Sequence, residues 1–226
     1  MSHSYEIEIK SLLGSKENAD KLKHALLQKD PSMSLVGKGK QLNHYFNTPA
    51  DLSKLEKVVM PIIEKSKIDS LKKIVAEGKK VSIRTRDADG KVLFVIKASI
   101  SDDSSANGVS RIEFESIVKL SLGKLDQVLL DAGLTYQAKW SREREEYQVG
   151  DMHVCLDKNA GYGYLAEFEK VLSSAGEAEK AKTDLLAFMK SVGVIELDQA
   201  RLERMFAHYN AHWAEYYGTD NIFDIQ

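Results

Sequence analysis

Five stretches of this chain place charged residues at every second position, and in four of them the residues between are apolar or small. Successive side chains of a β-strand point to opposite faces. Each stretch therefore predicts a strand whose alternate charged residues share one face, while the residues between them lie on the other face. Like charges at positions i and i+2 repel on such a face unless something bridges them. The stretches with this pattern are 6–10, 84–86, 111–115, 142–144 and 167–169.

One charged strand face is ordinary, because sheets with a solvated side carry surface ion pairs. Five such faces in one chain favour a shared charged interior. Carboxylates are the hard oxygen ligands of Mg²⁺ or Mn²⁺, whereas arginine and lysine bind phosphate oxygens. The pattern therefore predicts a barrel with charged side chains inside and apolar faces packed outward under helices.

The remaining periodicity predicts an α+β fold rather than a doubly wound parallel sheet. Strands are expected at 5–10, 40–47, 80–87, 91–98, 111–118, 137–148, 152–157 and 163–170. Helices are expected at 15–29, 51–77, 121–132, 177–191 and 197–216, with a break at Pro61. A hairpin turn is expected at 87–90, and a polar, mobile loop at 99–110.

Composition limits the classes of protein that fit. The 226 residues predict one large domain, 1–226, and the net charge of −2 gives no reason to expect nucleic-acid or membrane-surface binding. Cys155 is the single cysteine, so no intrachain disulfide can form; we expect this thiol to be buried and inert in a reducing compartment. Neither a signal peptide nor an apolar run of roughly 20 residues is visible, and we expect a cytoplasmic protein.

Seven motifs occur in an order typical of one known family. They are Glu-x-Glu-x-Lys at 6–10, Gln-x-Asn-x-Tyr-Phe at 41–46, Arg-x-Arg at 84–86, Lys97, Arg-x-Glu-x-Glu at 111–115, Arg-x-Arg-x-x-Tyr at 142–147, and Leu-Asp, Gly-x-Gly and Glu-x-Glu between 156 and 169. Over about 5–190 the chain resembles the CYTH domains, the triphosphate tunnel metalloenzymes. The resemblance implies a closed eight-stranded antiparallel β-barrel, the triphosphate tunnel, with helices packed outside.

The resemblance also implies roles for individual residues. Glu6, Glu8, Lys10, Glu167 and Glu169 are expected to be catalytic. The expected metal ligands, for Mg²⁺ or Mn²⁺, are Glu6, Glu8, Glu115, Asp157, Glu167 and Glu169. The expected phosphate-binding residues are Lys10, Arg84, Arg86, Lys97, Arg111, Arg142 and Arg144, and Glu113 completes the lining without an assigned role.

The chain also departs from the family pattern. Asn43 stands where the family usually has aspartate, which affects recognition of the substrate end. A helical insertion at about 51–79 and a C-terminal helical extension at about 196–226 lie outside the pattern, and we expect the aromatic residues of the extension to pack against the barrel wall. His44 is expected at the surface or the tunnel mouth rather than as a base.

Three functions remain open. The first is metal-dependent hydrolysis of inorganic or organic triphosphate, with tripolyphosphate, ATP or thiamine triphosphate as substrate. The second is class IV-type adenylyl cyclase activity, which converts ATP to cyclic AMP and pyrophosphate. The third is non-catalytic triphosphate or polyphosphate binding, against which the retained glutamates argue, because phosphate binding alone needs only the bases. We expect no nucleic-acid or membrane partner and leave a homodimer open.

Overall fold

The computed structural model describes residues 5–49, 51–99 and 111–226, so most of the expected loop at 99–110 lies outside the described residues. The fold is α+β, with an eight-stranded antiparallel sheet and, among the described residues, six α-helices. The strands are β1 (Tyr5–Gly14), β2 (Ser34–Phe46), β3 (Lys79–Ala88), β4 (Lys91–Ser99), β5 (Arg111–Ile117), β6 (Tyr136–Val149), β7 (Met152–Asn159) and β8 (Gly163–Leu172). The helices are α1 (Lys16–Lys29), α2 (Ser53–Val59), α3 (Ile68–Glu77), α4 (Leu122–Asp131), α5 (Ala178–Ser191) and α6 (Gln199–Tyr216).

Hydrogen bonds join the strands in the order β1-β8-β7-β6-β2-β3-β4-β5. Over the described residues this pairing does not close the sheet into a barrel. The expected elements are otherwise present, although β2 begins at Ser34 rather than at residue 40, and β1 continues to Gly14. The expected insertion forms α2 and α3, and α2 ends at Val59, just before Pro61, where the helix was expected to break.

Contacts divide the chain into two compact units. Within the described residues, the first unit comprises 5–40 and 141–226, and the second comprises 41–49, 51–99 and 111–140. Each unit has its own apolar core. A single domain over 1–226 stays a prediction.

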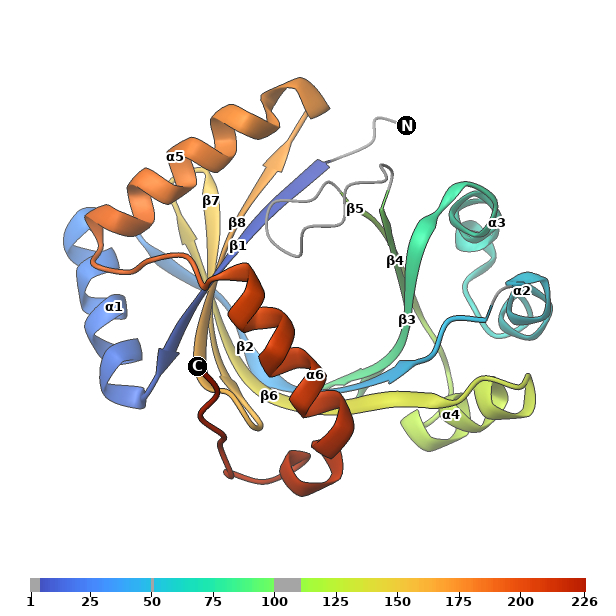
Figure 1. The fold of residues 1–226 in the computed structure, drawn as a ribbon. Helices are drawn as coiled ribbons and strands as arrows, with labels where there is room; N and C mark the ends of the chain where they lie inside the picture. Colours follow the sequence, from blue (N-terminus) through green and yellow to red (C-terminus); the bar gives the residue numbers. More distant parts are fainter. Residues whose placement is uncertain (1–4, 50, 100–110) are drawn as a thin grey trace. The chain divides into compact units, whose positions relative to one another are not determined.

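In the first unit, α1 and α5 cover one face of strands β1, β8 and β7 (Figure 1). Leu22 and Leu26 of α1 and Leu185 of α5 pack there against Ile9 of β1 and Phe168 of β8, and all five side chains are almost completely buried. Burial of such side chains stabilises the fold by roughly 1.5–3 kcal/mol each. The opposite faces of these strands are therefore the ones that carry the charged residues.

In the second unit, α2, α3 and α4 cover one face of β3 and β4 (Figure 1). Leu55 of α2, Leu71 of α3 and Leu125 of α4 pack with Ile83 and Phe94 of the strands. The β3–β4 hairpin closes where expected: its two-residue turn has positive φ at Asp89 (51°) and Gly90 (84°), as a type I′ turn requires.

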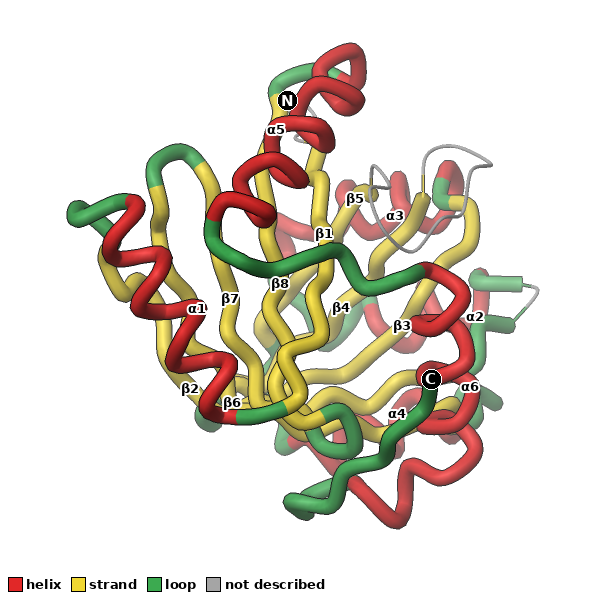
Figure 2. The backbone as a smooth tube through the Cα atoms, turned by 60° about the vertical axis from the view of Figure 1, so that its left-hand side comes forward, coloured by secondary structure: helices red, strands yellow, loops and turns green. Residues whose placement is uncertain are grey.

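The C-terminal extension is part of the first unit. The segment between α5 and α6 crosses β8 and β1 (Figure 2), and the Leu197 amide donates to the Lys10 carbonyl at 2.7 Å. Tyr209 of α6 is 0% exposed, which confirms that this aromatic residue is buried. The tail then binds the β7–β8 turn, because Gly161 donates to the Asn221 carbonyl at 3.0 Å and accepts from Phe223 at 2.8 Å. Among the described helices, none has the length and apolar composition to cross a membrane.

Glu145 joins three elements on the helix-covered side of the first unit. Its carboxylate accepts from Lys23 of α1 at 2.9 Å, from Lys38 of β2 at 2.8 Å and from the Tyr147 hydroxyl. The Lys38 hydrogen bond, followed by those from Tyr147 and Lys23, lowers the pKa of Glu145 from 4.5 to about 2. A lowered carboxyl pKa stabilises the fold above the unfolded-state value and ceases to do so as pH falls through the folded value.

We expect Glu145→Gln to lower the free energy of unfolding at pH 7 by about 1 kcal/mol, a figure that allows for solvent screening. The difference from wild type should shrink as pH falls from about 5 to about 2. Urea unfolding over that range measures it. Glu143→Gln is the control, because Glu143 is 55% exposed and forms a surface ion pair with Lys40. A difference that stays constant with pH would show that Glu145 does not act through its charge.

Candidate functional site

Charged side chains of the first unit lie on the strand faces opposite α1 and α5. The apolar residues that alternate with these charged residues along the strands point into the helix-covered core; they include Ile7, Ile9, Leu156 and Phe168. This confirms the alternation predicted for β1 and β8. We call the group the first charged cluster, and its members are Glu8, Lys10, Arg142, Arg144, Asp157, Glu167 and Glu169.

Asp157 holds the two arginines of this cluster. It is completely buried, and its Oδ1 accepts from Arg144 Nε at 2.7 Å. Its Oδ2 accepts from Arg144 Nη2 at 2.7 Å and from Arg142 Nη1 at 3.0 Å. The forked contact fixes the plane of the Arg144 guanidinium. In this structure Asp157 therefore positions basic groups, and its expected role as a metal ligand stays a prediction.

Glu167 lies among three basic side chains. Arg144 Nη2 donates to it, Lys10 Nζ is 3.5 Å away and Arg142 Nη1 is 3.9 Å away. Burial would raise the pKa of Glu167, but the charges of Arg144, Lys10 and Arg142 hold it well below its usual value. Glu167 is thus a carboxylate at neutral pH, as a metal ligand must be.

Glu8 and Glu169 sit directly opposite each other in the antiparallel pairing of β1 with β8. Like charges at this position repel, and the neighbouring Lys10, which pairs with Glu8, reduces the repulsion. Two facing carboxylates beside the ionised Glu167 form an oxygen donor set of the kind Mg²⁺ and Mn²⁺ prefer. The donor chemistry fits a divalent metal, although the described residues contain no ready-made group of three metal-ligating side chains.

The second unit has a charged face of its own. We call it the second charged cluster, and its members are Arg84, Arg86, Lys97, Glu113 and Glu115. Lys97 Nζ lies 3.0 Å from Glu113, and Arg86 Nη1 lies 2.8 Å from Glu115. Burial would raise the pKa of Glu113, but Lys97 and Arg84 lower it; burial and the adjacent Glu113 charge raise the pKa of Glu115 despite Arg86.

Arg84 is the most enclosed base of the second cluster, with a side chain that is 10% exposed. Its Nη1 donates to the Tyr45 hydroxyl at 2.8 Å, and its Nη2 donates to Glu113 at 3.0 Å. The Nε–H is buried and has no acceptor within the described part of the chain. A buried donor without a partner is costly, and a ligand oxygen such as that of phosphate would satisfy it.

Two expected site residues can be placed only by their backbone. Glu6 lies in β1 opposite Val171, and Arg111 lies in β5 opposite Ser99, but their side chains are outside the described part of the protein. Cys155 is buried, as expected, and lies opposite Glu167 in the β7–β8 pairing. Burial raises the pKa of its thiol to about 12, so it is not a thiolate nucleophile at neutral pH.

Sequence reasoning missed the residues that orient the arginines of the second cluster. Asn43 Oδ1 accepts from Arg86 Nε at 2.9 Å, so the asparagine that departs from the family pattern contacts a phosphate-binding candidate. Tyr45 contacts Arg84. Asn43 and Tyr45 are two positions apart and therefore share one face of the strand, and this spacing was a signal that could have revealed both residues. The surface position expected for His44 is wrong: it is 6% exposed, because Asp126 of α4 binds it on the helix-covered side.

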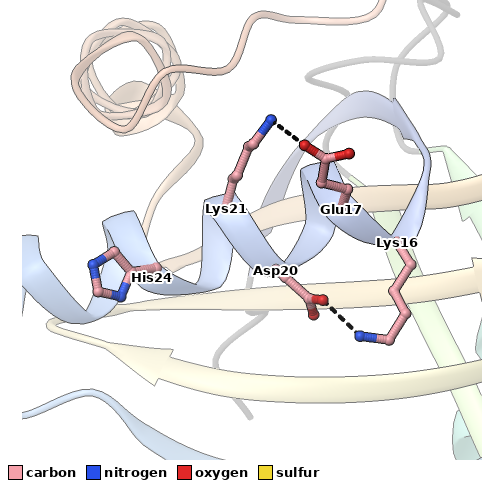
Figure 3. A pocket seen from close by; sticks show the side chains of 5 residues that line it. All are labelled: Lys16, Glu17, Asp20, Lys21 and His24. Atoms are coloured by element: carbon pink, nitrogen blue, oxygen red, sulfur yellow. Dashed lines mark hydrogen bonds and ion pairs between the residues drawn. The ribbon is translucent and has the colours of Figure 1, made fainter.

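A shallow surface depression on α1 is lined by Lys16, Glu17, Asp20, Lys21 and His24 (Figure 3). Its two ion pairs, Lys16 with Asp20 at 2.6 Å and Lys21 with Glu17 at 2.7 Å, join residues one helical turn apart. Exposed pairs of this kind stabilise a helix slightly and do not form a binding site. Neither charged cluster contributes to it.

The CYTH domain model matches residues 4–202, a range that contains the members of both charged clusters. The chain belongs to the CYTH family. CYTH proteins typically act on triphosphates and depend on divalent metal, and this is the chemistry that clustered carboxylates, arginines and lysines suit. The match ends within α6, so the tail that binds the β7–β8 turn is outside it.

Solved structures show the same fold. A protein of Pyrococcus horikoshii OT3 has a TM-score of 0.60 at 20% identity, covering 88% of this chain and 99% of its own. A conserved hypothetical protein of Pyrococcus furiosus has a TM-score of 0.59 at 19% identity, and the match covers 83% of this chain and 90% of that protein. A Vibrio parahaemolyticus protein provisionally described as an adenylate cyclase has a TM-score of 0.59 at 14% identity, and the match covers 90% of this chain and 98% of that protein. No curated protein matches the chain.

Proposed function

We propose that this CYTH protein is a divalent-metal-dependent enzyme that hydrolyses inorganic or organic triphosphate. The observation that carries the proposal is the buried Arg84 Nε–H, a directed donor with no acceptor among the described residues. The guanidinium is already held on two sides by Tyr45 and Glu113, so the remaining donor is preorganised for an incoming oxygen. Phosphate is an anion whose charge and geometry suit an arginine fork.

In the proposed reaction, water attacks the terminal phosphorus and the bond to the bridging oxygen breaks. Charge builds on the leaving oxygen and on the equatorial oxygens, where fixed basic groups stabilise it. Arg84, Arg86 and Lys97 from the second cluster, and Lys10, Arg142 and Arg144 from the first, are the proposed phosphate-binding residues, together with Arg111. The closed tunnel expected from the family resemblance is part of this proposal.

Glu8, Glu167 and Glu169 are the proposed metal ligands, with Glu6, Glu115 and Asp157 as further candidates. Bound Mg²⁺ or Mn²⁺ would neutralise phosphate charge and make water more acidic. Glu167 contributes a carboxylate that stays ionised through the neutral range, because Arg144, Lys10 and Arg142 overcome the effect of burial on its pKa. The single cysteine supports a reducing, cytoplasmic location.

Adenylyl cyclase activity is the second candidate, favoured by the fold shared with the provisionally described Vibrio cyclase. Cyclisation must hold the base and ribose so that the 3′-hydroxyl attacks the α-phosphorus and pyrophosphate leaves. Cyclisation therefore needs contacts to base and ribose in addition to those that bind the phosphates, whereas hydrolysis of tripolyphosphate needs only the charged residues. Fold likeness at this identity says little about which reaction occurs, so hydrolysis remains our first proposal.

We expect tripolyphosphate to be turned over at least as fast as ATP, with phosphate as the product and no turnover in a chelator. The test incubates the protein with tripolyphosphate, ATP or thiamine triphosphate in Mg²⁺, Mn²⁺ or chelator, and separates phosphate, pyrophosphate and cyclic AMP by chromatography. Cyclic AMP as the main product, with tripolyphosphate acting only as an inhibitor, would establish the cyclase. Binding without turnover in either metal would establish the non-catalytic binder. Light scattering on the same samples tests the homodimer.

A further inference from the structure

Asp126 of α4 is a buried carboxylate that the proposed function does not use. It is 3% exposed and accepts from three side chains of three strands. Thr85 Oγ1 of β3 donates to Oδ1 at 2.6 Å, while His44 Nδ1 of β2 and the Tyr136 hydroxyl of β6 lie 2.6 and 2.7 Å from Oδ2. Burial would raise its pKa, but the bonds from His44, Thr85 and Tyr136 lower it.

This group is not a nucleophile with its base. The Thr85 hydroxyl donates to the carboxylate and not to the histidine ring, so His44 cannot take its proton. Thr85 is 0% exposed and His44 is 6% exposed, so neither side chain is open to a substrate from solvent. The network must therefore act through the strands that it joins.

The pairing register shows which residues those strands control. His44 is the partner of Thr85 in the β2–β3 pairing. The pairs on either side are Asn43 with Arg86 and Tyr45 with Arg84. Because successive side chains alternate between faces, the Asp126 network holds one face while both arginines and their orienting partners occupy the other.

We propose that Asp126 is a positioning residue for phosphate binding, which clamps His44 to Thr85 and thereby fixes Arg84 and Arg86 on the opposite face of β2 and β3. This inference rests on the proposed function for its ligand. Arg84 makes the requirement strict, because its Nε–H can meet a phosphate oxygen only if Tyr45 and Glu113 hold the rest of the guanidinium in place. A one-residue slip of β2 against β3 would exchange the two faces and break both sets of contacts.

The first arm of the test needs no ligand. It records the Nε–Hε NMR signal of Arg84 in the full chain, assigned by its loss in Arg84→Lys. We expect a single, slowly exchanging signal in wild type, and a shifted or broadened one in Asp126→Asn and in the milder Thr85→Val and Tyr136→Phe. The control is Asp131→Asn at the end of the same helix, where the exposed Asp131 accepts from Gln127 one turn earlier. We expect its Arg84 signal to match wild type.

The second arm measures tripolyphosphate affinity by calorimetry in Mg²⁺. We expect Asp126→Asn to weaken binding about tenfold, and the loss to be absent when Arg84 is already alanine. If the role of Asp126 were merely structural, Asp126→Asn would lower the unfolding temperature yet leave the folded protein with normal affinity. Alternatively, its loss of affinity would add fully to the loss caused by Arg84→Ala.

The two arms separate this inference from the proposed function. If wild type does not bind tripolyphosphate, the proposed function fails, and the Arg84 signal alone decides whether Asp126 positions that side chain. An Arg84 signal that is unchanged in Asp126→Asn and in Thr85→Val overturns the inference, as does full additivity with Arg84→Ala. If Asp126→Asn does not fold, Thr85→Val and Tyr136→Phe carry both arms, because each removes one hydroxyl and little volume.

Discussion

Replacing Glu169 with glutamine is expected to remove metal-dependent turnover of tripolyphosphate while the protein stays folded. Glu169 faces Glu8 across the β1–β8 pairing, and both belong to the proposed metal site. Glutamine keeps the size of the side chain but loses the charge that a divalent cation requires. We expect turnover to fall by on the order of 100-fold or more in both Mg²⁺ and Mn²⁺.

The stability of the Glu169→Gln variant should not fall with its activity. In the absence of metal, Glu169→Gln relieves the repulsion with Glu8, so the unfolding temperature should equal or exceed that of wild type. Metal should then raise that temperature less in the variant, because a ligand stabilises only the state it binds. The control is Glu143→Gln, a solvent-facing change on β6 that should alter neither quantity. Wild-type turnover of Glu169→Gln in both metals would falsify the ligand assignment.

Replacing Arg144 with alanine is expected to have the largest combined effect on stability and binding. Arg144 bonds both oxygens of the fully buried Asp157 and also Glu167. Burial would lower the pKa of Arg144, but Glu167 and Asp157 raise it well above the usual value, so the guanidinium stays charged. Removing it leaves the fully buried Asp157 and the partly buried Glu167 with fewer partners, which costs about 3–5 kcal/mol.

A second substitution separates the two roles of Arg144. In Arg144→Met with Asp157→Asn, the charge on both partners is removed, and most of the lost stability should return. Tripolyphosphate affinity should not return, because each charge-assisted contact with phosphate contributes roughly 1.5–3 kcal/mol. Arg204→Ala on the exposed side of α6 is the control for loss of an arginine. Urea unfolding and calorimetry measure the two quantities, and wild-type affinity in the double variant would exclude Arg144 from the phosphate site.

The strand faces were predictable because side-chain alternation is a local property of extended chain. Ile7 and Ile9 had to lie opposite Glu8 and Lys10 whatever the rest of the fold, and they are the buried face of β1. The Asp89–Gly90 turn was equally predictable, because few other residues accept positive φ at both positions. The start of β2 at Ser34 was missed, since its first residues are exposed and show no alternation.

Partners distant in the sequence were not predictable. His44 and Asp126 are 82 positions apart, and Lys23 and Glu145 are 122 apart, so only packing brings them together. Asp126 follows Leu125 on the buried face of α4. The sequence gives no reason for a charge there, because the groups that donate to it come from β2, β3 and β6.

By itself, the sequence determined the α+β class, the alternating faces of the strands and the family to which the chain belongs. These follow from local geometry and from ordered motifs. The tertiary structure alone decided how each charge is used: Asp157 holds two arginines, Glu167 stays ionised among three bases, and Arg84 keeps one buried donor that no described residue accepts. The physical reason is that ion pairing depends on distances of a few ångströms between strands, and register and packing set those distances.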